Sequence, residues 1–179
     1  LLEIMSKYKC NSLVFSSSAT IYAQKQNSAL KENSDIGPIN TYGNTKLAIE
    51  TFLEDLFKSS ENHYKFASLR YFNPIGSHPS GLLGESPQGK PNNIFPLIIN
   101  VAMGLQKELE IYGSDWPTND GTPVRDYIHV MDVAESHIKV LEHLFETRPS
   151  YFNLNIGTGV GTSVLELVKI FERVNNVRV

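Results

Sequence analysis

The chain has 179 residues, of which 41% are hydrophobic and 20% charged, a composition that supports one domain-sized core in an ordinary globular protein. Its 16 basic and 19 acidic residues are interleaved and give a formal net charge of -3, which argues against a nucleic-acid partner. The longest apolar run, 94–105, is interrupted by proline, asparagine and glycine and is shorter than the ~20 residues that cross a membrane. The single cysteine, Cys10, excludes an internal disulfide and fits the cytoplasm, and five histidines without metal-ligand spacing predict no metal site.

The first part of the chain predicts two strands of a parallel sheet with a helix between them. The expected elements are the end of a helix at 1–8, a buried strand at 13–15, a polar loop at 23–41, a helix at 44–58 and a strand at 66–72, halted by Asn73 and Pro74. The helix at 44–58 carries an apolar stripe along one side. Strand, helix and strand at this spacing form one right-handed parallel crossover.

The second part begins with a long loop at 76–93, rich in glycine, proline, serine and asparagine, which marks a domain junction. The elements expected after it are a helix at 94–105, a strand at 109–112, a helix at 133–145, a strand at 152–156 and a last helix that opens with the capping box Ser163-x-x-Glu166 and runs into the C-terminus without a stop signal. We therefore predict an α/β protein with two domains, 1–75 and 76–179. Both ends are typical of a piece cut from a longer protein.

Two segments near the N-terminus carry the residues of an acid–base site. Ser16-Ser17-Ser18 follows the first apolar strand, and Tyr42 precedes Lys46 by one helical turn, so these two share a helix face. An ammonium beside a phenol favours the phenolate, whose ordinary pKa is roughly 10. With a serine hydroxyl on the same substrate oxygen, these groups suit proton removal from an alcohol while hydride leaves for a nicotinamide. The pair also occurs by chance, as an aromatic and a surface lysine on an amphipathic helix.

The glycines within 157–161 imitate a dinucleotide-binding loop. A fingerprint of that kind needs its third glycine one place later, where this chain has Thr162. Tight turns at a helix entrance are the better interpretation of these glycines. We expect the phosphate-binding loop of the full protein to lie upstream of Leu1.

Six longer segments carry a resemblance to known enzymes, namely residues 16–22, 42–46, 70–81, 87–93, 120–130 and 157–161. Together they closely resemble the UDP-galactose 4-epimerase family of the extended short-chain dehydrogenase/reductase superfamily, over nearly the whole chain. The resemblance implies an NAD-dependent isomerase of galactose metabolism, which interconverts UDP-galactose and UDP-glucose by transient oxidation at C4 of the sugar. It also implies a Rossmann-like doubly wound parallel sheet, with its C-terminal half in 1–75, and a smaller mixed α/β nucleotide-sugar-binding domain, incomplete in 76–179.

The roles known in that family carry over to matching positions. Tyr42 resembles the base that takes the proton of the sugar 4-hydroxyl, Ser18 hydrogen-bonds that hydroxyl and relays the proton, and Lys46 holds nicotinamide-ribose hydroxyls. The resemblance implies NAD contacts for Ser18, Tyr42, Lys46 and Phe72, and UDP-sugar contacts for Ser18, Tyr42, Asn73, Asn93, Ile94, Phe95, Glu110, Ile111, Tyr112 and Arg125. The residues alone also allow an internal ion pair for Arg125, and turn or cap roles for Asn73 and Asn93.

Two alternatives stay open. One is a nucleotide-sugar 4,6-dehydratase or decarboxylase of the same superfamily, although a dehydratase needs an acidic pair where this chain has Ala19-Thr20. The other is a non-catalytic relative that acts as a binding module, although Tyr42 and Lys46 are both present. The chain departs from the family pattern at Ala23, which replaces a glycine and would strain the backbone if that position needs a positive φ.

The resemblance further implies a homodimer when the protein is full length. The first strands of the sheet and the phosphate-binding loop are not in the sequence. We therefore expect the isolated 179-residue chain to be poorly soluble, to purify without NAD and to show no epimerase activity.

Overall fold

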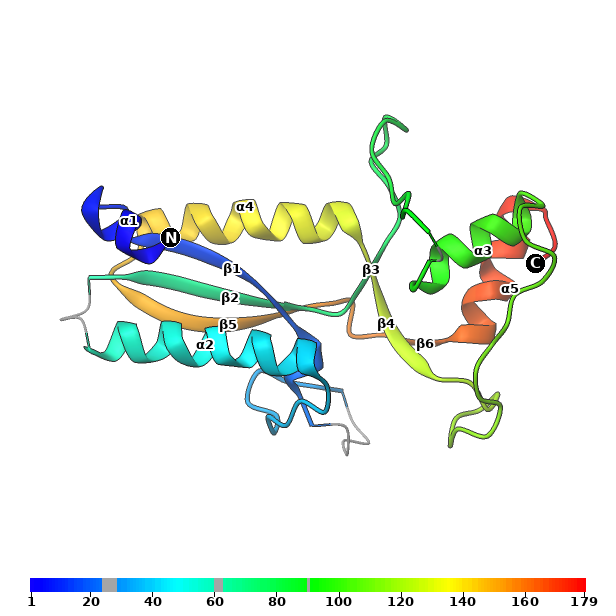
Figure 1. The fold of residues 1–179 in the computed structure, drawn as a ribbon, viewed down its shortest axis with the longest axis horizontal. Helices are drawn as coiled ribbons and strands as arrows, with labels where there is room; N and C mark the ends of the chain where they lie inside the picture. Colours follow the sequence, from blue (N-terminus) through cyan, green and yellow to red (C-terminus); the bar gives the residue numbers. More distant parts are fainter. Residues whose placement is uncertain (24–28, 60–62, 90) are drawn as a thin grey trace. The chain divides into compact units, whose positions relative to one another are not determined.

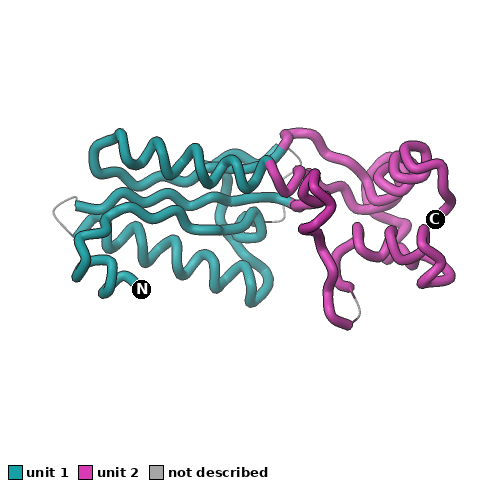
Figure 2. Tube along the Cα trace, turned by 90° about the horizontal axis from the view of Figure 1, so that it is seen from above, with its two compact units in different colours: residues 1–72, 132–157 teal, residues 73–131, 158–179 magenta. Residues whose placement is uncertain are grey.

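The computed structural model describes residues 1–23, 29–59, 63–89 and 91–179, which form two compact units (Figure 2). Unit 1 consists of residues 1–72 and 132–157, and unit 2 of residues 73–131 and 158–179. The chain therefore leaves unit 1, returns to it, and ends in unit 2. The expected boundary between a cofactor-binding domain, 1–75, and a nucleotide-sugar-binding domain, 76–179, stays a prediction, because ligand-binding domains and compact units need not coincide.

Unit 1 is built around a parallel sheet. Its strands lie in the order β1 (Ser12–Ser18), β2 (Lys65–Tyr71) and β5 (Ser150–Ile156), and both strand pairs are parallel. Figure 1 shows α2 (Thr41–Ser59) on one face of this sheet and α4 (Val130–Glu146) on the other, with α1 (Leu2–Lys7) before β1. The predicted α/β class and the parallel pairing of the first two strands are confirmed.

The two faces of β2 have different surroundings, because side chains alternate along a strand. Ala67 and Leu69, both fully buried, pack against Val140 and Leu144 of α4 in an apolar core. Arg70 points to the opposite face, where α2 lies, and binds a carboxylate there. One face of the sheet is therefore an ordinary apolar interface, whereas the other holds a buried charge.

Unit 2 contains a small mixed sheet and two helices. Its strands lie in the order β3 (Asn73–Ile75), β4 (Val124–His129) and β6 (Gly161–Ser163), with β3 parallel and β6 antiparallel to β4. The helices are α3 (Ile94–Ala102) and α5 (Val164–Asn175). Ile98 of α3 packs with Leu167 and Val168 of α5, and the rings of Phe95 and Phe171 meet edge to face at 5.8 Å. The mixed α/β character expected for this part is confirmed.

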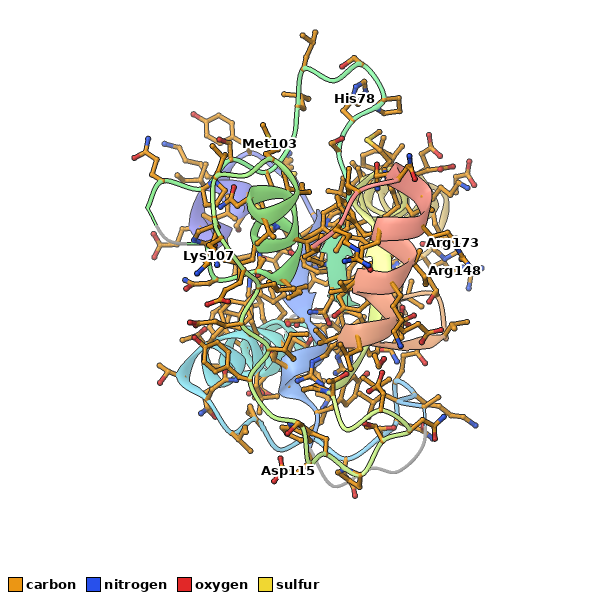
Figure 3. All side chains as sticks on the ribbon, turned by 90° about the vertical axis from the view of Figure 1, so that its right-hand side faces the viewer. His78, Met103, Lys107, Asp115, Arg148 and Arg173 are labelled. Carbon is orange, nitrogen blue, oxygen red and sulfur yellow. The ribbon has the colours of Figure 1, made fainter. Side chains whose placement is uncertain are left out.

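The strands of unit 2 differ from the sequence predictions. The predicted strand at 109–112 is wrong, since residues 103–123 contain no helix or strand. Gly104 and Gly113, which both have a positive φ, lie on either side of residues 109–112. Lys107 and Asp115, also within 103–123, project at the surface (Figure 3). Strand β2 ends at Tyr71, before Asn73 and Pro74, as expected. These two residues then open β3, an edge strand where proline's missing donor is tolerated.

Two helix ends also differ from prediction. Ser163 caps α5 as expected, because its Oγ accepts from the Glu166 N–H at 3.1 Å. The helix then ends at Asn175 rather than running on, since Asn176 takes a left-handed conformation (φ 52°) that asparagine tolerates well. The helix expected at 94–105 ends earlier, at Ala102, two residues before Gly104. Within the described ranges, no helix combines the length and apolarity needed to cross a membrane.

Candidate active site

Helix α2 begins close to the end of strand β1. Its first turn is capped by Asn40, whose Oδ1 accepts from the Gly43 N–H at 2.7 Å. A Cβ at Gly43 would lie 2.7 Å from the carbonyl oxygen of Thr20, so a glycine is needed for this close approach. The first turn of α2, which contains Tyr42, therefore rests on the chain just after β1. Sequence reasoning missed Gly43, although a glycine inside a helix start is itself a signal of close packing.

Lys46 lies one turn after Tyr42 on the same side of α2, as predicted. Its Nζ donates to the Ser16 carbonyl oxygen at 2.8 Å. The same ammonium lies 5.4 Å from the ring centroid of Tyr42 and 5.2 Å from that of Phe15, within the range of a cation–π contact. Lys46 therefore joins the tyrosine-bearing face of the helix to the end of β1.

Ser18 is the last residue of β1 and is almost fully buried. Its Oγ accepts hydrogen bonds from the Thr20 backbone N–H at 3.2 Å and from the Thr20 hydroxyl at 3.0 Å. The Tyr42 side chain is 51% exposed, and its hydroxyl has no hydrogen-bond partner among the residues that the structure describes. Helix α2 contacts the chain two residues before Ser18, through the bond of Lys46 to Ser16, and two residues after it, where Gly43 meets Thr20. The turn of α2 that carries Tyr42 is therefore held against the segment that contains Ser18.

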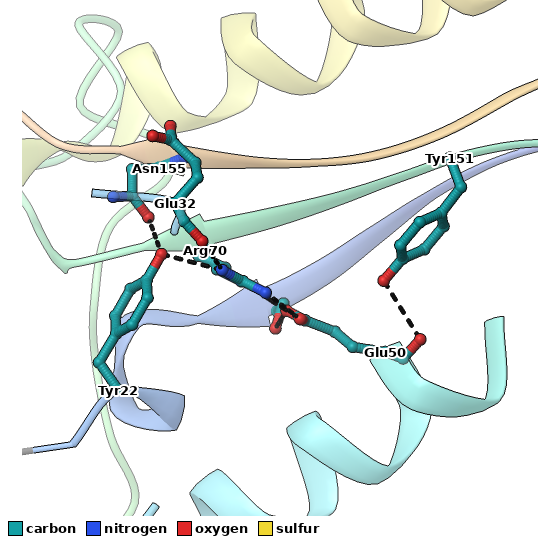
Figure 4. A network of polar contacts seen from close by, with 7 residues as sticks. Tyr22, Glu32, Glu50, Arg70, Tyr151 and Asn155 are labelled. Carbon is teal, nitrogen blue, oxygen red and sulfur yellow. Dashed lines mark hydrogen bonds and ion pairs between the residues drawn. The ribbon is translucent and has the colours of Figure 1, made fainter. Parts of the chain in front are cut away.

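Behind these residues lies a buried ion pair between Glu50 of α2 and Arg70 of β2 (Figure 4). Arg70 Nη2 donates to Glu50 Oε2 at 2.6 Å, and Arg70 Nε lies 3.1 and 3.2 Å from the two carboxylate oxygens. Ser17, next to Ser18, donates a short hydrogen bond to the same carboxylate. Glu50 stands one turn after Lys46, so this carboxylate links the site helix to strands β1 and β2.

The other end of Arg70 is also bound. Its Nη1 donates to the Tyr22 hydroxyl and to the Glu32 carbonyl oxygen, both at 3.0 Å, and Tyr22 donates to Asn155 Oδ1 at 2.6 Å. Burial on its own would lower the pKa of Arg70, but its hydrogen bonds to Glu50 and Tyr22 outweigh burial and raise the pKa above its ordinary value. Sequence reasoning missed this network, although an arginine inside an apolar strand was an available signal.

The backbone at Ala23 is not strained. Among the described non-glycine residues, positive φ angles occur only at Lys9 and Asn176. A Cβ at Gly37 would lie 3.1 Å from the Ala23 Cβ, so the missing side chain of Gly37 leaves room for the alanine. The predicted loop at 23–41 includes residues 24–28, which lie outside the described residues.

In unit 2, Asn73 and Arg125 lie on neighbouring strands. Asn73 is exposed on β3 and is in register with Tyr127 of β4, two residues after Arg125. Arg125 is exposed, and its guanidinium donates to the adjacent Val124 carbonyl oxygen at 2.8 Å. Within the described parts of the chain Arg125 forms no ion pair, so the internal-salt-bridge alternative has no support. Burial raises the pKa of Tyr127, while the nearby Arg125 acts to lower it.

The other predicted nucleotide contacts lie on α3 and on the loop that follows. Asn93 stands at the N-cap of α3 but makes no side-chain cap bond; its Nδ2 donates to Glu85 Oε1 at 2.6 Å. Ile94 and Phe95 form the first turn, where backbone N–H groups are free for an anion. The predicted contacts Glu110, Ile111 and Tyr112 lie outside the sheet of unit 2, and Tyr112 donates to Glu110 Oε2 at 2.8 Å.

The glycine-rich turn at 157–161 is held by a carboxylate of the protein itself. Asp126 accepts from the Thr158 N–H at 3.0 Å, the Thr158 hydroxyl at 2.7 Å and the Gly159 N–H at 2.8 Å. Gly159 has a φ of 75°, which favours glycine. The interpretation as a tight turn is therefore confirmed, since N–H groups that a phosphate would need are already used.

Residues 1–157 match the NAD dependent epimerase/dehydratase family. The chain belongs to this family.

Relatives within the family are identical to this chain at close to half of the aligned positions. The UDP-glucose 4-epimerase of Bacillus subtilis is 49% identical over 175 residues, which are 98% of this chain and 51% of the relative. The UDP-glucose 4-epimerase 4 of Oryza sativa subsp. japonica is 49% identical over 179 residues, which are 100% of this chain and 48% of the relative. The chain therefore spans about half the length of the curated relatives it matches.

Solved structures of family members have the same fold. The UDP-glucose-4-epimerase from Stenotrophomonas maltophila, crystallised with bound NAD and formylated UDP-arabinopyranose, gives a TM-score of 0.95 at 46% identity and covers 100% of this chain and 53% of its own. The enzyme from Bifidobacterium longum, in complex with NAD+ and UDP, gives 0.91 at 43% identity and covers 99% and 52%. A Rossmann-type sheet is thus the fold of unit 1.

The residues of unit 1 fit the nicotinamide end of the cofactor that names the family. The Lys46 ammonium has three N–H donors, and among the described residues only Ser16 takes one, which leaves donors for ribose hydroxyls. Tyr42 offers a partly exposed phenol that has no hydrogen-bond partner within the described part of the chain. Phe72 is half-buried directly after β2 and donates its N–H to Ile156 at 3.1 Å.

Proposed function

We propose that the full-length protein is an NAD-dependent isomerase that interconverts UDP-galactose and UDP-glucose. The observation that carries the proposal is the arrangement of Ser18, Tyr42 and Lys46, in which the first turn of α2 rests on the chain beside Ser18 and Lys46 is tied to the same strand end. The identity of 49% to the UDP-glucose 4-epimerase of Bacillus subtilis supports the same assignment.

Each of the three residues has a distinct task in this proposal. Tyr42 removes the proton from the sugar 4-hydroxyl as the C4–H bond breaks. Ser18 donates a hydrogen bond to the 4-oxygen. Lys46 binds the ribose of the cofactor and places a positive charge beside the tyrosine ring. NAD, when bound, would supply the acceptor and donor of the C4 hydride.

The nucleotide half of the substrate belongs to unit 2 in this proposal. Asn73 and Arg125 on neighbouring strands present an amide and a guanidinium that forms no ion pair among the described residues, and both groups suit a pyrophosphate. The first turn of α3, with Asn93, Ile94 and Phe95, adds free backbone donors, and Glu110, Ile111 and Tyr112 complete the proposed UDP contacts. Phe72, which directly precedes Asn73 in the sequence, is proposed to contact the cofactor rather than the nucleotide.

Replacement of Arg125 by leucine tests the nucleotide assignment. Because the guanidinium has no ion-pair partner in the described chain, its loss leaves the fold intact but removes a charge from the nucleotide. We expect Arg125→Leu to weaken UDP binding by roughly 2–5 kcal/mol, measured by calorimetry with UDP alone on the full-length protein. Arg148→Leu, which removes an exposed arginine of unit 1, is the matched control and should leave UDP affinity unchanged. Equal affinities for both variants would remove Arg125 from the nucleotide site.

The direct test of the proposed function is incubation of the full-length protein with UDP-galactose, followed by NMR of the products. The proposal predicts UDP-glucose without net consumption of NAD. A 4-keto-6-deoxy sugar would instead identify a dehydratase, which the sequence disfavours because Ala19 and Thr20 stand where an acidic pair is needed. UDP-galactose that binds but is not converted would identify a binding module.

We further propose that the full-length protein is a homodimer of the cytoplasm. Large apolar side chains are exposed on both helices that cover the sheet of unit 1, with Ile49 and Phe52 on α2 and Ile138 and Phe145 on α4, and a partner subunit would cover such residues. The single cysteine, Cys10, is exposed and free, which fits a reducing compartment.

A further inference from the structure

The Ser18 hydroxyl has an unusual hydrogen-bond environment. A serine hydroxyl can accept two hydrogen bonds and donate one. Both bonds accepted by Ser18 come from a single residue, Thr20, through its backbone N–H at 3.2 Å and its hydroxyl at 3.0 Å. With both lone pairs occupied, the Ser18 proton is the only part of the hydroxyl that is left for another partner. Among the described residues, none accepts it.

Thr20 is well placed to impose this arrangement. Its backbone belongs to the short 3-10 helix η1 (Ala19–Ile21), which begins with Ser18 as N-cap and is anchored by the fully buried Ile21. Gly43 of α2 closes over the Thr20 carbonyl oxygen, where an added Cβ would lie only 2.7 Å away. The Thr20 side chain itself is exposed, so its conformation is set by its β-branched geometry and its bond to Ser18.

We propose that Thr20 is a positioning residue, which occupies the acceptor sites of Ser18 and so directs the Ser18 proton toward the substrate oxygen. The inference rests on the proposed function, in which the sugar 4-oxygen lies against Ser18. That oxygen changes from an alcohol to a carbonyl during the reaction, and a carbonyl oxygen can only accept hydrogen bonds. A donor already aimed at it needs no reorientation as the charge on the oxygen develops.

Removal of the Thr20 hydroxyl would free one lone pair of Ser18. The Ser18 hydroxyl could then rotate among its staggered positions, and only a fraction of molecules would present the proton outward. Thr20→Val is the variant of choice, because valine keeps the shape and the β-branch and replaces the hydroxyl with a methyl group. Thr20→Ser keeps the hydroxyl and loses only a methyl group, so it is the matched control.

In the full-length protein, we expect Thr20→Val to lower kcat about tenfold, the factor that corresponds to one neutral hydrogen bond, with little change in KM. Thr20→Ser should retain most of the wild-type kcat. The melting temperature should hardly change, since the side chain is exposed. The decisive comparison is between the effect of Thr20→Val in the wild-type protein and its effect in the Ser18→Ala variant, in which Thr20 has no serine hydroxyl to position. In that background Thr20→Val should cost nothing further, and an unchanged tenfold cost would overturn the proposal.

A second measurement does not depend on activity. Neutron diffraction of the full-length protein with bound NAD shows where hydroxyl deuterons lie. The proposal predicts the Thr20 deuteron between Thr20 Oγ1 and Ser18 Oγ, and the Ser18 deuteron directed away from Thr20. A Ser18 deuteron directed at Thr20 would overturn the proposal. If the wild-type protein does not interconvert the sugars, the proposed function fails by itself, and the neutron result alone decides the role of Thr20.

Discussion

Replacement of Tyr42 by phenylalanine in the full-length protein is expected to reduce turnover by roughly 10²–10⁴-fold, the usual contribution of a positioned acid–base group. Phenylalanine keeps the ring over which the Lys46 ammonium lies at 5.4 Å, so the packing of α2 against the strand end should persist. Only the phenolic hydroxyl is lost, and this is the group that takes the proton. The measurement is kcat at saturating UDP-galactose, with NAD content determined by mass spectrometry.

The chain offers a matched control for this substitution. Tyr8 is 72% exposed at the end of α1, and the Lys7 ammonium lies 5.8 Å from its ring centroid, so this is a tyrosine–lysine contact without a serine strand beside it. Tyr8→Phe should leave turnover at the wild-type level. If Tyr42→Phe also turned over at that level while it still held NAD, Tyr42 would have no part in the chemistry.

The largest expected effect on stability belongs to the buried pair behind the site. Glu50 and Arg70 are 3% and 4% exposed, and the guanidinium binds both carboxylate oxygens. Glu50→Ala leaves Arg70 charged without its carboxylate, and we expect the free energy of unfolding to fall by about 3–5 kcal/mol. Urea denaturation of the full-length protein, followed by fluorescence, measures this difference.

An exposed ion pair on the same helix provides the control. Glu54 binds Lys58 at 2.6 Å, one turn apart, and the two side chains are 42% and 64% exposed. Glu54→Ala should cost only about 0.3–0.5 kcal/mol, because water screens such pairs. Similar denaturation midpoints for the two variants would mean that the Glu50–Arg70 contact does not hold α2 to the sheet.

Much of unit 1 could be predicted because its signals are local. The apolar strand before Ser16, the helical pattern after Tyr42 and the second apolar strand each indicate an element without reference to the rest of the chain. The spacing of Tyr42 and Lys46 placed them on one helix face, and the cation–π geometry agrees with that placement. The limits of these elements moved by only a few residues, since end positions depend on caps such as Asn40.

The strands of unit 2 could not be predicted in the same way. β3 and β6 have three residues each, and their strand character comes from pairing with β4, far away in the sequence. The residues at 109–112 have strand-like composition but pair with no strand among the described residues, so they stay irregular. Strand formation in such short segments is decided by tertiary contacts.

The candidate site shows the same division. Ser18, Tyr42 and Lys46 are recognisable from spacing and from the strand end, whereas the bonds of Thr20 to Ser18 and of Glu50 to Arg70 follow from how α2 is seated on the sheet. Arg125 and Asn93 were assigned through family resemblance. The structure shows no ion pair of Arg125 among the described residues and no side-chain cap bond of Asn93, whose amide binds Glu85 instead. Their nucleotide contacts stay predictions for calorimetry.

The fate of a deuterium label at C4 tests the proposed chemistry most directly. Full-length protein is incubated with UDP-galactose that carries deuterium at C4, and the position of the label in the products is read by NMR. Transient oxidation at C4, with return of the same hydride to the opposite face, predicts UDP-glucose that retains deuterium at C4. Deuterium that is lost to water, or that is found at C6 of a deoxy sugar, would contradict the assignment of this chain to a 4-epimerase.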